Sequence, residues 1–240
     1  MQTPPTSEIP VVILAGGYGS RLEEHTQKIP KPLVLIGNDP IIVHIIRLWY
    51  RAGFREFIIV GGYKCDLLKE EMDELVLPNA TIRTVNTGLD TGTGGRLLAI
   101  SNIIENRRFG LSYGDGLTSY PLGALLDFHD TFGGVVSMLV THPPPRFGEV
   151  EIGDFGLVTS FSEKPISDKW INAGFFICEP EIFDYFSSSS DMIESVALPD
   201  LAKRWNLYAL TYEGWWHCMD TPKDLKELNR LWNSGEAPWK

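Results

Sequence analysis

Short apolar runs alternate along the chain with stretches in which apolar residues recur every three or four positions. Val11–Leu14 and Phe57–Val60 are continuous apolar runs, which are typical of buried parallel strands. Between them, Pro40–Ala52 has helical spacing, and Gly53 follows as a helix-ending residue. The same alternation predicts further helices over 64–75, 97–105 and 122–131 and further strands over 81–85, 109–113, 135–140 and 171–178. Strands alternating with helices indicate an α/β protein with a parallel sheet.

The predicted fold is a single three-layer, doubly wound, mostly parallel α/β sheet over residues 1–240. This length suits one large domain or two small ones; we expect a single domain, with residues 1–10 forming a flexible segment. A hairpin is predicted where strands 150–152 and 157–161 flank the turn Gly153–Gly156. The serine run at 187–190 is expected to be a surface loop.

Composition and charge narrow the possible partners. The net charge of −10 argues against a global nucleic-acid or membrane-surface role, although a local basic pocket can still bind an anionic substrate. The three cysteines are widely spaced and match neither a disulfide framework nor a zinc motif. The first ten residues are polar and proline-bearing, unlike a signal peptide, and no apolar run is long enough to span a membrane. A cytoplasmic location is therefore predicted.

The first apolar run leads directly into a glycine cluster that is suited to binding phosphate. Gly16, Gly17 and Gly19 let the backbone approach a ligand closely, and Arg21 offers a planar fork to phosphate oxygens. Lys31 stands on a stiff support between Pro30 and Pro32. The loop lacks the Gly-Lys-Ser/Thr ending of a P-loop. It also has Leu22 where a dinucleotide-binding motif needs glycine, which argues against a nicotinamide-dependent oxidoreductase.

Two aspartates follow predicted strands and are candidate metal ligands. Asp115 lies between two glycines after the strand 109–113, and Asp220 precedes Thr221-Pro222, which we expect to be the N-cap and first residue of a helix. Ligands bind at the carboxyl ends of strands in such sheets, where one or two carboxylates suffice for Mg²⁺. A second glycine-rich loop, 86–95, precedes the predicted helix 97–105. Arg96 at its start is predicted to face an anion or a base.

The segments 14–22 and 26–33 resemble the signature of sugar-phosphate nucleotidyltransferases. Four further motifs occur in the order expected of that family: Tyr113–Gly116, Glu163–Pro165, Asn172–Phe175 and Met219–Thr221. Finer details resemble its glucose-1-phosphate cytidylyltransferase branch: Thr93–Leu97, Arg146–Gly148, Phe161–Pro165, Trp216 before Cys218-Met-Asp, and Leu231–Trp239. The likeness runs from about residue 11 to the C-terminus.

This resemblance implies a Rossmann-like nucleotide-diphospho-sugar transferase fold and a Mg²⁺-dependent reaction of CTP with glucose 1-phosphate to give CDP-glucose and pyrophosphate. Catalytic roles fall on Arg21, Lys31 and Asp115, and metal binding on Asp115 and Asp220. The implied nucleotide-binding residues are Leu14, Ala15, Gly16, Gly17, Gly19, Ser20, Arg21, Thr91, Arg96 and Gly114. The implied sugar-phosphate-binding residues are Arg146, Glu163, Lys164 and Asn172, with Lys164 held extended before Pro165.

The chain departs from the branch in three places. The segment between Lys64 and Thr87 is much shorter than usual, Ala173 replaces a common glycine, and Ile29 replaces a frequent lysine. The missing segment leaves subunit contacts, the sugar pocket and therefore the choice of substrates open. The same chemistry with UTP, dTTP, GTP or another sugar 1-phosphate is one alternative, and a non-catalytic sugar-nucleotide-binding protein is another. A homo-oligomer is left open by the sequence.

Overall fold

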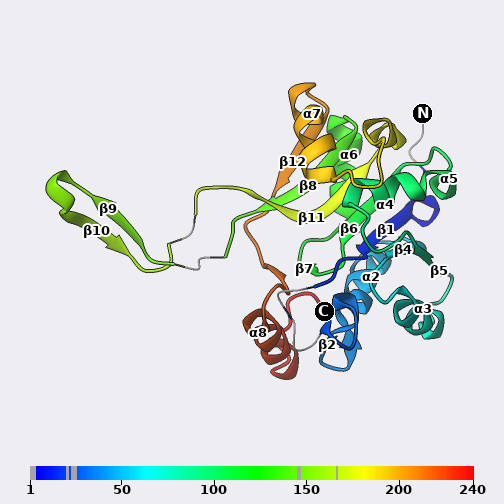
Figure 1. The fold of residues 1–240 in the computed structure, drawn as a ribbon, viewed down its shortest axis with the longest axis horizontal. Coiled ribbons are helices and arrows are strands. Elements are labelled where there is room, and N and C mark those ends of the chain that lie inside the picture. The colour runs from blue at the N-terminus through cyan, green and yellow to red at the C-terminus, as the bar shows by residue number, and fades with distance from the viewer. Residues whose placement is uncertain (1–3, 20–21, 23–25, 145–146, 166) are drawn as a thin grey trace.

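The fold is built on one seven-stranded sheet (Figure 1). The computed structural model describes residues 4–19, 22, 26–144, 147–165 and 167–240. In spatial order the strands are β12 (Leu207–Thr211), β8 (Val136–Thr141), β11 (Ile171–Cys178), β6 (Phe109–Tyr113), β1 (Pro10–Ala15), β4 (Glu56–Gly61) and β5 (Thr81–Asn86). Neighbouring strands run parallel, except that β11 is antiparallel to both β6 and β8. The expected mostly parallel α/β fold is confirmed.

Helices cover both faces of this sheet, so the protein has three layers. Alternate residues of β1 show the division: Val11 and Ile13 belong to one buried cluster, and Val12 and Leu14 to the other. The helices are α2 (Ile41–Arg51), α3 (Cys65–Glu74), α4 (Thr93–Ala99), α5 (Ser101–Ile104), α6 (Gly123–Phe132), α7 (Leu198–Lys203) and α8 (Pro222–Asn233). No helix in the described ranges is long and apolar enough to cross a bilayer.

Short elements connect these layers. The small strands are β2 (Leu35–Ile36), β3 (Asp39–Pro40), β7 (Gly116–Thr118), β9 (Glu149–Ile152), β10 (Val158–Ser162) and β13 (Trp216–Cys218). Single turns of 3₁₀-helix lie at Thr6–Glu8, Lys31–Leu33 and Asp154–Gly156, a longer one lies at Pro180–Tyr185, and a π-helix spans Ile193–Ala197. Because β7 pairs with β13, the ends of two distant chain segments meet beside the sheet.

Three local expectations need correction. The helix expected from residue 97 begins at Thr93, which places Arg96 inside α4 rather than at a helix start. Lys164 has φ +48°, in the left-handed region, where extended backbone was predicted. Ile9 is buried against the core and Pro10 begins β1, so the expected flexible segment does not reach these residues.

A two-stranded ribbon extends away from the body of the protein (Figure 1). Residues 147–165, called the arm below, contain the antiparallel strands β9 and β10. The hairpin predicted from the sequence is therefore confirmed. In the sequence the arm lies between β8 and β11, whose residues Thr141 and Ile171 are paired neighbours in the sheet.

Candidate active site

A cavity of about 500 Å³ opens at the carboxyl ends of β1 and β6. This is the edge at which doubly wound sheets bind ligands. The described residues that line the cavity are Leu14, Ala15, Gly16, Gly17, Lys31, Pro32, Thr93, Arg96, Tyr113, Gly114, Asp115, Met192 and Glu194. Most of these residues follow strands β1 and β6 or belong to motifs that the sequence analysis singled out. Met192 and Glu194 come from a segment that the sequence analysis did not single out.

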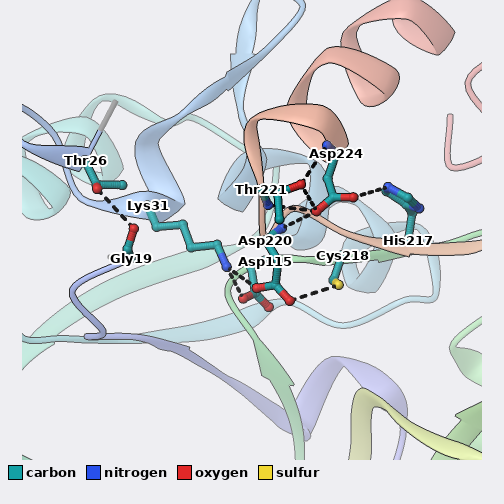
Figure 2. A network of polar contacts seen from close by, with 9 residues as sticks. All are labelled: Gly19, Thr26, Lys31, Asp115, His217, Cys218, Asp220, Thr221 and Asp224. Carbon is teal, nitrogen blue, oxygen red and sulfur yellow. Dashed lines mark hydrogen bonds and ion pairs between the residues drawn. The ribbon is translucent and has the colours of Figure 1, made fainter. Parts of the chain in front are cut away.

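Lys31 joins the two candidate metal ligands (Figure 2). Its Nζ lies 2.7 Å from Asp115 Oδ2 and 2.8 Å from Asp220 Oδ1. The lysine sits in a 3₁₀ turn between Pro30 and Pro32, whose fixed φ angles stiffen its support. Burial alone would lower the pKa of Lys31, but the two carboxylates outweigh that effect and raise it. The lysine therefore stays charged at neutral pH.

Local backbone contacts bring the two aspartates together. Met219 N donates to the carbonyl of Asp115 at 2.9 Å, next to the β7–β13 pairing. Thr221 caps α8 through Asp224 N, while the Asp224 carboxylate accepts from the backbone N–H groups of Asp220 and Thr221 at 3.1 and 2.7 Å. The predicted N-cap at Thr221 and Pro222 at the first helical position are thus confirmed. Figure 2 shows how this cap fixes the turn that carries Asp220.

The Asp115–Asp220 pair has the chemistry that Mg²⁺ requires. Both side chains offer carboxylate oxygens to one cation, Lys31 Nζ, and both remain partly accessible. Mg²⁺ takes one or two protein carboxylates and completes its shell with phosphate oxygens and water. Within the described ranges no group of three or more His, Cys, Asp or Glu side chains is placed to hold a metal ion.

The loop after β1 presents backbone to the cavity. Leu14, Ala15, Gly16 and Gly17 line it directly. Gly19, with φ +65°, turns the chain, and its carbonyl accepts from Thr26 Oγ1 at 3.1 Å (Figure 2). Three predicted site residues, Ser20, Arg21 and Arg146, lie outside the described residues.

Arg96 is buried, with 4% of its surface exposed, and holds three loops together. Its guanidinium donates to the carbonyls of Gly16, Gly61, Gly88 and Leu89 and to Thr87 Oγ1, over 2.7–3.2 Å. A Cβ at Gly16 would lie 2.2 Å from Arg96 Cζ, so glycine is needed there for this close approach. The Arg96 side chain thus holds the backbone at Gly16, which lines the cavity, and Arg96 itself is also one of the lining residues.

Replacing Arg96 by methionine is expected to lower the melting temperature by about 6–12 °C. The substitution removes five donated hydrogen bonds, two of them to carbonyls of the buried residues Gly16 and Gly61, and we expect a loss on the order of 3 kcal/mol. In a chain of this size each kcal/mol lowers the melting temperature by about 2–4 °C. Thermal unfolding followed by circular dichroism measures it. Arg230→Met, at an exposed arginine of α8, is the matched control and should shift the midpoint by less than about 2 °C. Equal midpoints for the two variants would contradict the role of Arg96 in holding the loops.

A second polar group, which the sequence did not indicate, also lines the cavity. Glu194 accepts hydrogen bonds from Tyr113 and from Thr93 Oγ1, the latter at 2.7 Å. Asn172 Nδ2 donates to the Tyr113 hydroxyl at 3.1 Å, which connects a predicted sugar-phosphate residue to this group. Burial, reinforced by the Glu194 charge, raises the pKa of Tyr113, so its hydroxyl remains protonated. Tyr113 belongs to the motif Tyr113–Gly116 noted in the sequence, whereas nothing in the pattern around Glu194 indicates a binding or catalytic residue.

Six predicted site residues within the described ranges do not line the cavity: Gly19, Asn172 and Asp220, whose contacts are given above, and Thr91, Glu163 and Lys164. Thr91 Oγ1 donates to the carbonyl of Thr87 at 2.7 Å, within its own loop. Glu163 and Lys164 are more than half exposed at the base of the arm and pair with each other at 3.2 Å. Their ligand-binding roles remain predictions.

The chain belongs to the nucleotidyl transferase family, whose model matches residues 10–234. It is 37% identical over 250 aligned positions to a probable glucose-1-phosphate cytidylyltransferase of Bacillus subtilis, and 36% identical over 252 to the glucose-1-phosphate cytidylyltransferase of Salmonella typhi. Each alignment covers 95% of this chain and 98% of the relative. Because both alignments exceed the 240 residues of this chain, each relative has residues without a counterpart here.

Solved structures with the same fold support the architecture. HddC from Yersinia pseudotuberculosis complexed with GMP-PN has a TM-score of 0.72 at 22% identity, covering 93% of this chain and 99% of that one. UDP-glucose pyrophosphorylase complexed with UDP-glucose has a TM-score of 0.73 at 18% identity, covering 95% and 99%. At these identities the likeness establishes the fold.

Proposed function

We propose that this chain joins CTP to α-D-glucose 1-phosphate, giving CDP-glucose and pyrophosphate. The observation that carries the proposal is the convergence of Lys31, Asp115 and Asp220 beside the cavity at the end of β1. Its choice of substrates rests on the cytidylyltransferases that are 36–37% identical over nearly their whole length. A cytoplasmic location and a role in nucleotide-sugar and polysaccharide biosynthesis accompany the proposal.

In this reaction an oxygen of the sugar phosphate attacks the α-phosphorus in line, and the bond to the bridging oxygen of pyrophosphate breaks. The attacking phosphate is already ionised at neutral pH, so no general base is required. Catalysis then consists of positioning and charge neutralisation. Asp115 and Asp220 would hold Mg²⁺, which supplies charge neutralisation and orientation for phosphate oxygens.

The remaining roles follow the position of each residue. Lys31, with Arg21, would neutralise the charge on the triphosphate. The backbone of residues 14–19 would cradle the nucleotide, with Gly114, Thr91 and Arg96 beside it. Asn172, held by Tyr113, would orient the sugar phosphate together with Glu163, Lys164 and Arg146.

The test is pyrophosphate release from glucose 1-phosphate and Mg²⁺, with CTP, UTP, dTTP, ATP and GTP supplied one at a time. A strong preference for CTP is the expected result, and Lys31→Ala serves as the inactive control. Faster release with another nucleotide would overturn the choice of CTP while keeping the reaction class.

If none of the five nucleotides gives pyrophosphate release, the next assay combines CTP with mannose 1-phosphate. Guanylyltransferases for that sugar are also relatives, at 31% identity over 89% of this chain and 62% of theirs. Pyrophosphate release in that assay would show that mannose 1-phosphate, rather than glucose 1-phosphate, is the sugar substrate. No release with either sugar, together with measurable CTP binding, would favour the non-catalytic binding protein.

A further inference from the structure

Asp224 holds more of the active-site backbone than a helix cap requires. In a capping box, the carboxylate at the third helical position accepts from the backbone N–H of the N-cap residue, which here is Thr221 at 2.7 Å. The same oxygen, Asp224 Oδ2, also accepts from the backbone N–H of Asp220 at 3.1 Å. The contact with Asp220 lies outside the box, and it ties the cap directly to a candidate metal ligand (Figure 2).

His217 holds the other oxygen of the Asp224 carboxylate. Its Nε2 lies 3.3 Å from Asp224 Oδ1. Nε2 is buried, and this contact is the polar contact that the described residues give it. The imidazole is carried by β13 and stacks on Trp215, with ring centroids 6.3 Å apart. The Asp224 carboxylate is therefore held on both sides, by backbone donors at one oxygen and by the imidazole at the other (Figure 2).

The backbone around Asp220 is thus fixed from two directions. Met219 N donates to the carbonyl of Asp115 at 2.9 Å, which links the backbones of the two candidate ligands. From the opposite direction, Asp224 holds the N–H of Asp220. The side chains of Asp224 and His217 are only 14% and 20% exposed, so water competes little for these contacts. A cation that binds both carboxylates depends on the separation that these contacts set.

We propose that Asp224, supported by His217, is a positioning residue for the metal site. Its carboxylate fixes the turn that carries Asp220 and thereby sets the affinity of the site for a divalent cation. The inference rests on the proposed function, because that function assigns a metal to Asp115 and Asp220. Loss of a residue that orients a metal ligand typically lowers metal affinity by about 10- to 100-fold.

Positioning can be separated from charge at this residue. A carboxylate near the site also attracts a cation through space, without fixing any backbone. Asp224→Asn removes the charge but keeps the size and an oxygen that can accept from the N–H groups of Asp220 and Thr221, whereas Asp224→Ala removes both. Positioning therefore predicts that the asparagine variant stays close to the wild type and the alanine variant does not. Attraction through space predicts equal losses in the two variants.

The test is the binding of Mn²⁺, as a probe for Mg²⁺, to the substrate-free chain, followed by the electron paramagnetic resonance signal of the free ion. The dissociation constant should rise at least about 10-fold in Asp224→Ala and less than about threefold in Asp224→Asn. Asp220→Asn is the reference for loss of a ligand and should weaken binding at least as much. Asp130→Ala, at a carboxylate of α6 that pairs with Arg108 before β6, is the matched control and should keep the wild-type constant.

Circular dichroism confirms that each variant is folded. Asp224→Ala also loses the capping box, so a lower melting temperature is expected from it whether or not it positions a ligand. If that variant does not fold, His217→Phe takes its place, because it removes the contact behind the carboxylate and leaves the backbone donors of the cap intact. Its dissociation constant should rise about three- to tenfold.

Three results would overturn the inference. Equal constants for the wild type and for folded Asp224→Ala, or for His217→Phe in its place, would show that the turn at Asp220 needs no such support. Equal losses in Asp224→Ala and Asp224→Asn would assign the effect to charge. Both results leave the proposed function intact. Equal binding by the wild type and Asp220→Asn would instead overturn the metal pair itself, and with it both the metal chemistry of the proposed function and this inference.

Discussion

A chain with Lys31→Ala is expected to turn over about 10³-fold more slowly than the wild type, with a much smaller change in KM. The ammonium group lies within 2.8 Å of both Asp115 and Asp220, in a partly buried position at the cavity where phosphate charge would develop. A charge that acts mainly in the transition state affects kcat more than substrate binding. Steady-state pyrophosphate release, with each substrate varied, measures both constants.

The matched control is Lys69→Ala, at an exposed lysine of α3 that pairs with Asp73 one turn further along the helix. It should leave kcat within about twofold, since exposed ion pairs contribute little. Both variants should keep the circular dichroism spectrum of the wild type. Near-normal turnover by the Lys31 variant would remove this residue from the mechanism.

Replacing either Asp115 or Asp220 by asparagine is expected to lower activity at least about 10²-fold and to remove its dependence on Mg²⁺. An asparagine at either position would keep the size of the side chain and a hydrogen-bond acceptor for Lys31, but would lose the negative charge that a hard cation requires. The measurement is initial rate against Mg²⁺ concentration, with EDTA as the zero point.

Asp200→Asn on α7, where the aspartate pairs with Arg204 at the surface, is the control for the loss of one carboxylate. It should follow the wild-type Mg²⁺ curve. Full activity of the wild type in EDTA, or an unaltered Mg²⁺ curve for Asp115→Asn and Asp220→Asn, would show that the two carboxylates do not form a metal site.

Much of the fold and the centre of the site could be predicted because both depend on where strands end. Apolar runs located β1, β4 and β11, and the motifs that follow β1 and β6 must lie at one edge of a parallel sheet. The contact of Lys31 with Asp115 and Asp220 is the structural consequence. The roles assigned to these residues remain to be measured.

The start of α4 could not be predicted because its glycines serve packing rather than flexibility. Gly94 and Gly95 disfavour a helix by propensity, which is why the segment reads as a loop. A Cβ at Gly94 would lie 2.4 Å from the ring of Phe186, and one at Gly95 only 2.0 Å from the carbonyl of Ser189. The close approach of segment 186–191 therefore selects glycine inside a helix, and tertiary contact overrides propensity.

The direction of β11 and the position of Glu194 could not be predicted from the sequence either. An apolar run has the same pattern in either direction, so nothing in Ile171–Cys178 shows that this strand is antiparallel. That direction is what brings its first residues, including Asn172, to the edge where β6 ends. Glu194 reaches the cavity only through the π-helix that follows Met192, a tertiary effect without a local signal.

The pairing of Thr141 with Ile171 makes the connection 142–170 an insertion into a β-hairpin. Neighbouring antiparallel strands can be joined by a turn of about two residues, so the sheet does not need this connection for its topology. Its length and sequence can therefore diverge between related proteins while the core strands keep their places. For protein engineering, the same two positions are a natural boundary at which the connection can be exchanged for that of a relative without redesigning the seven-stranded sheet, and β9 and β10 can be shortened while Glu163 and Lys164 are kept.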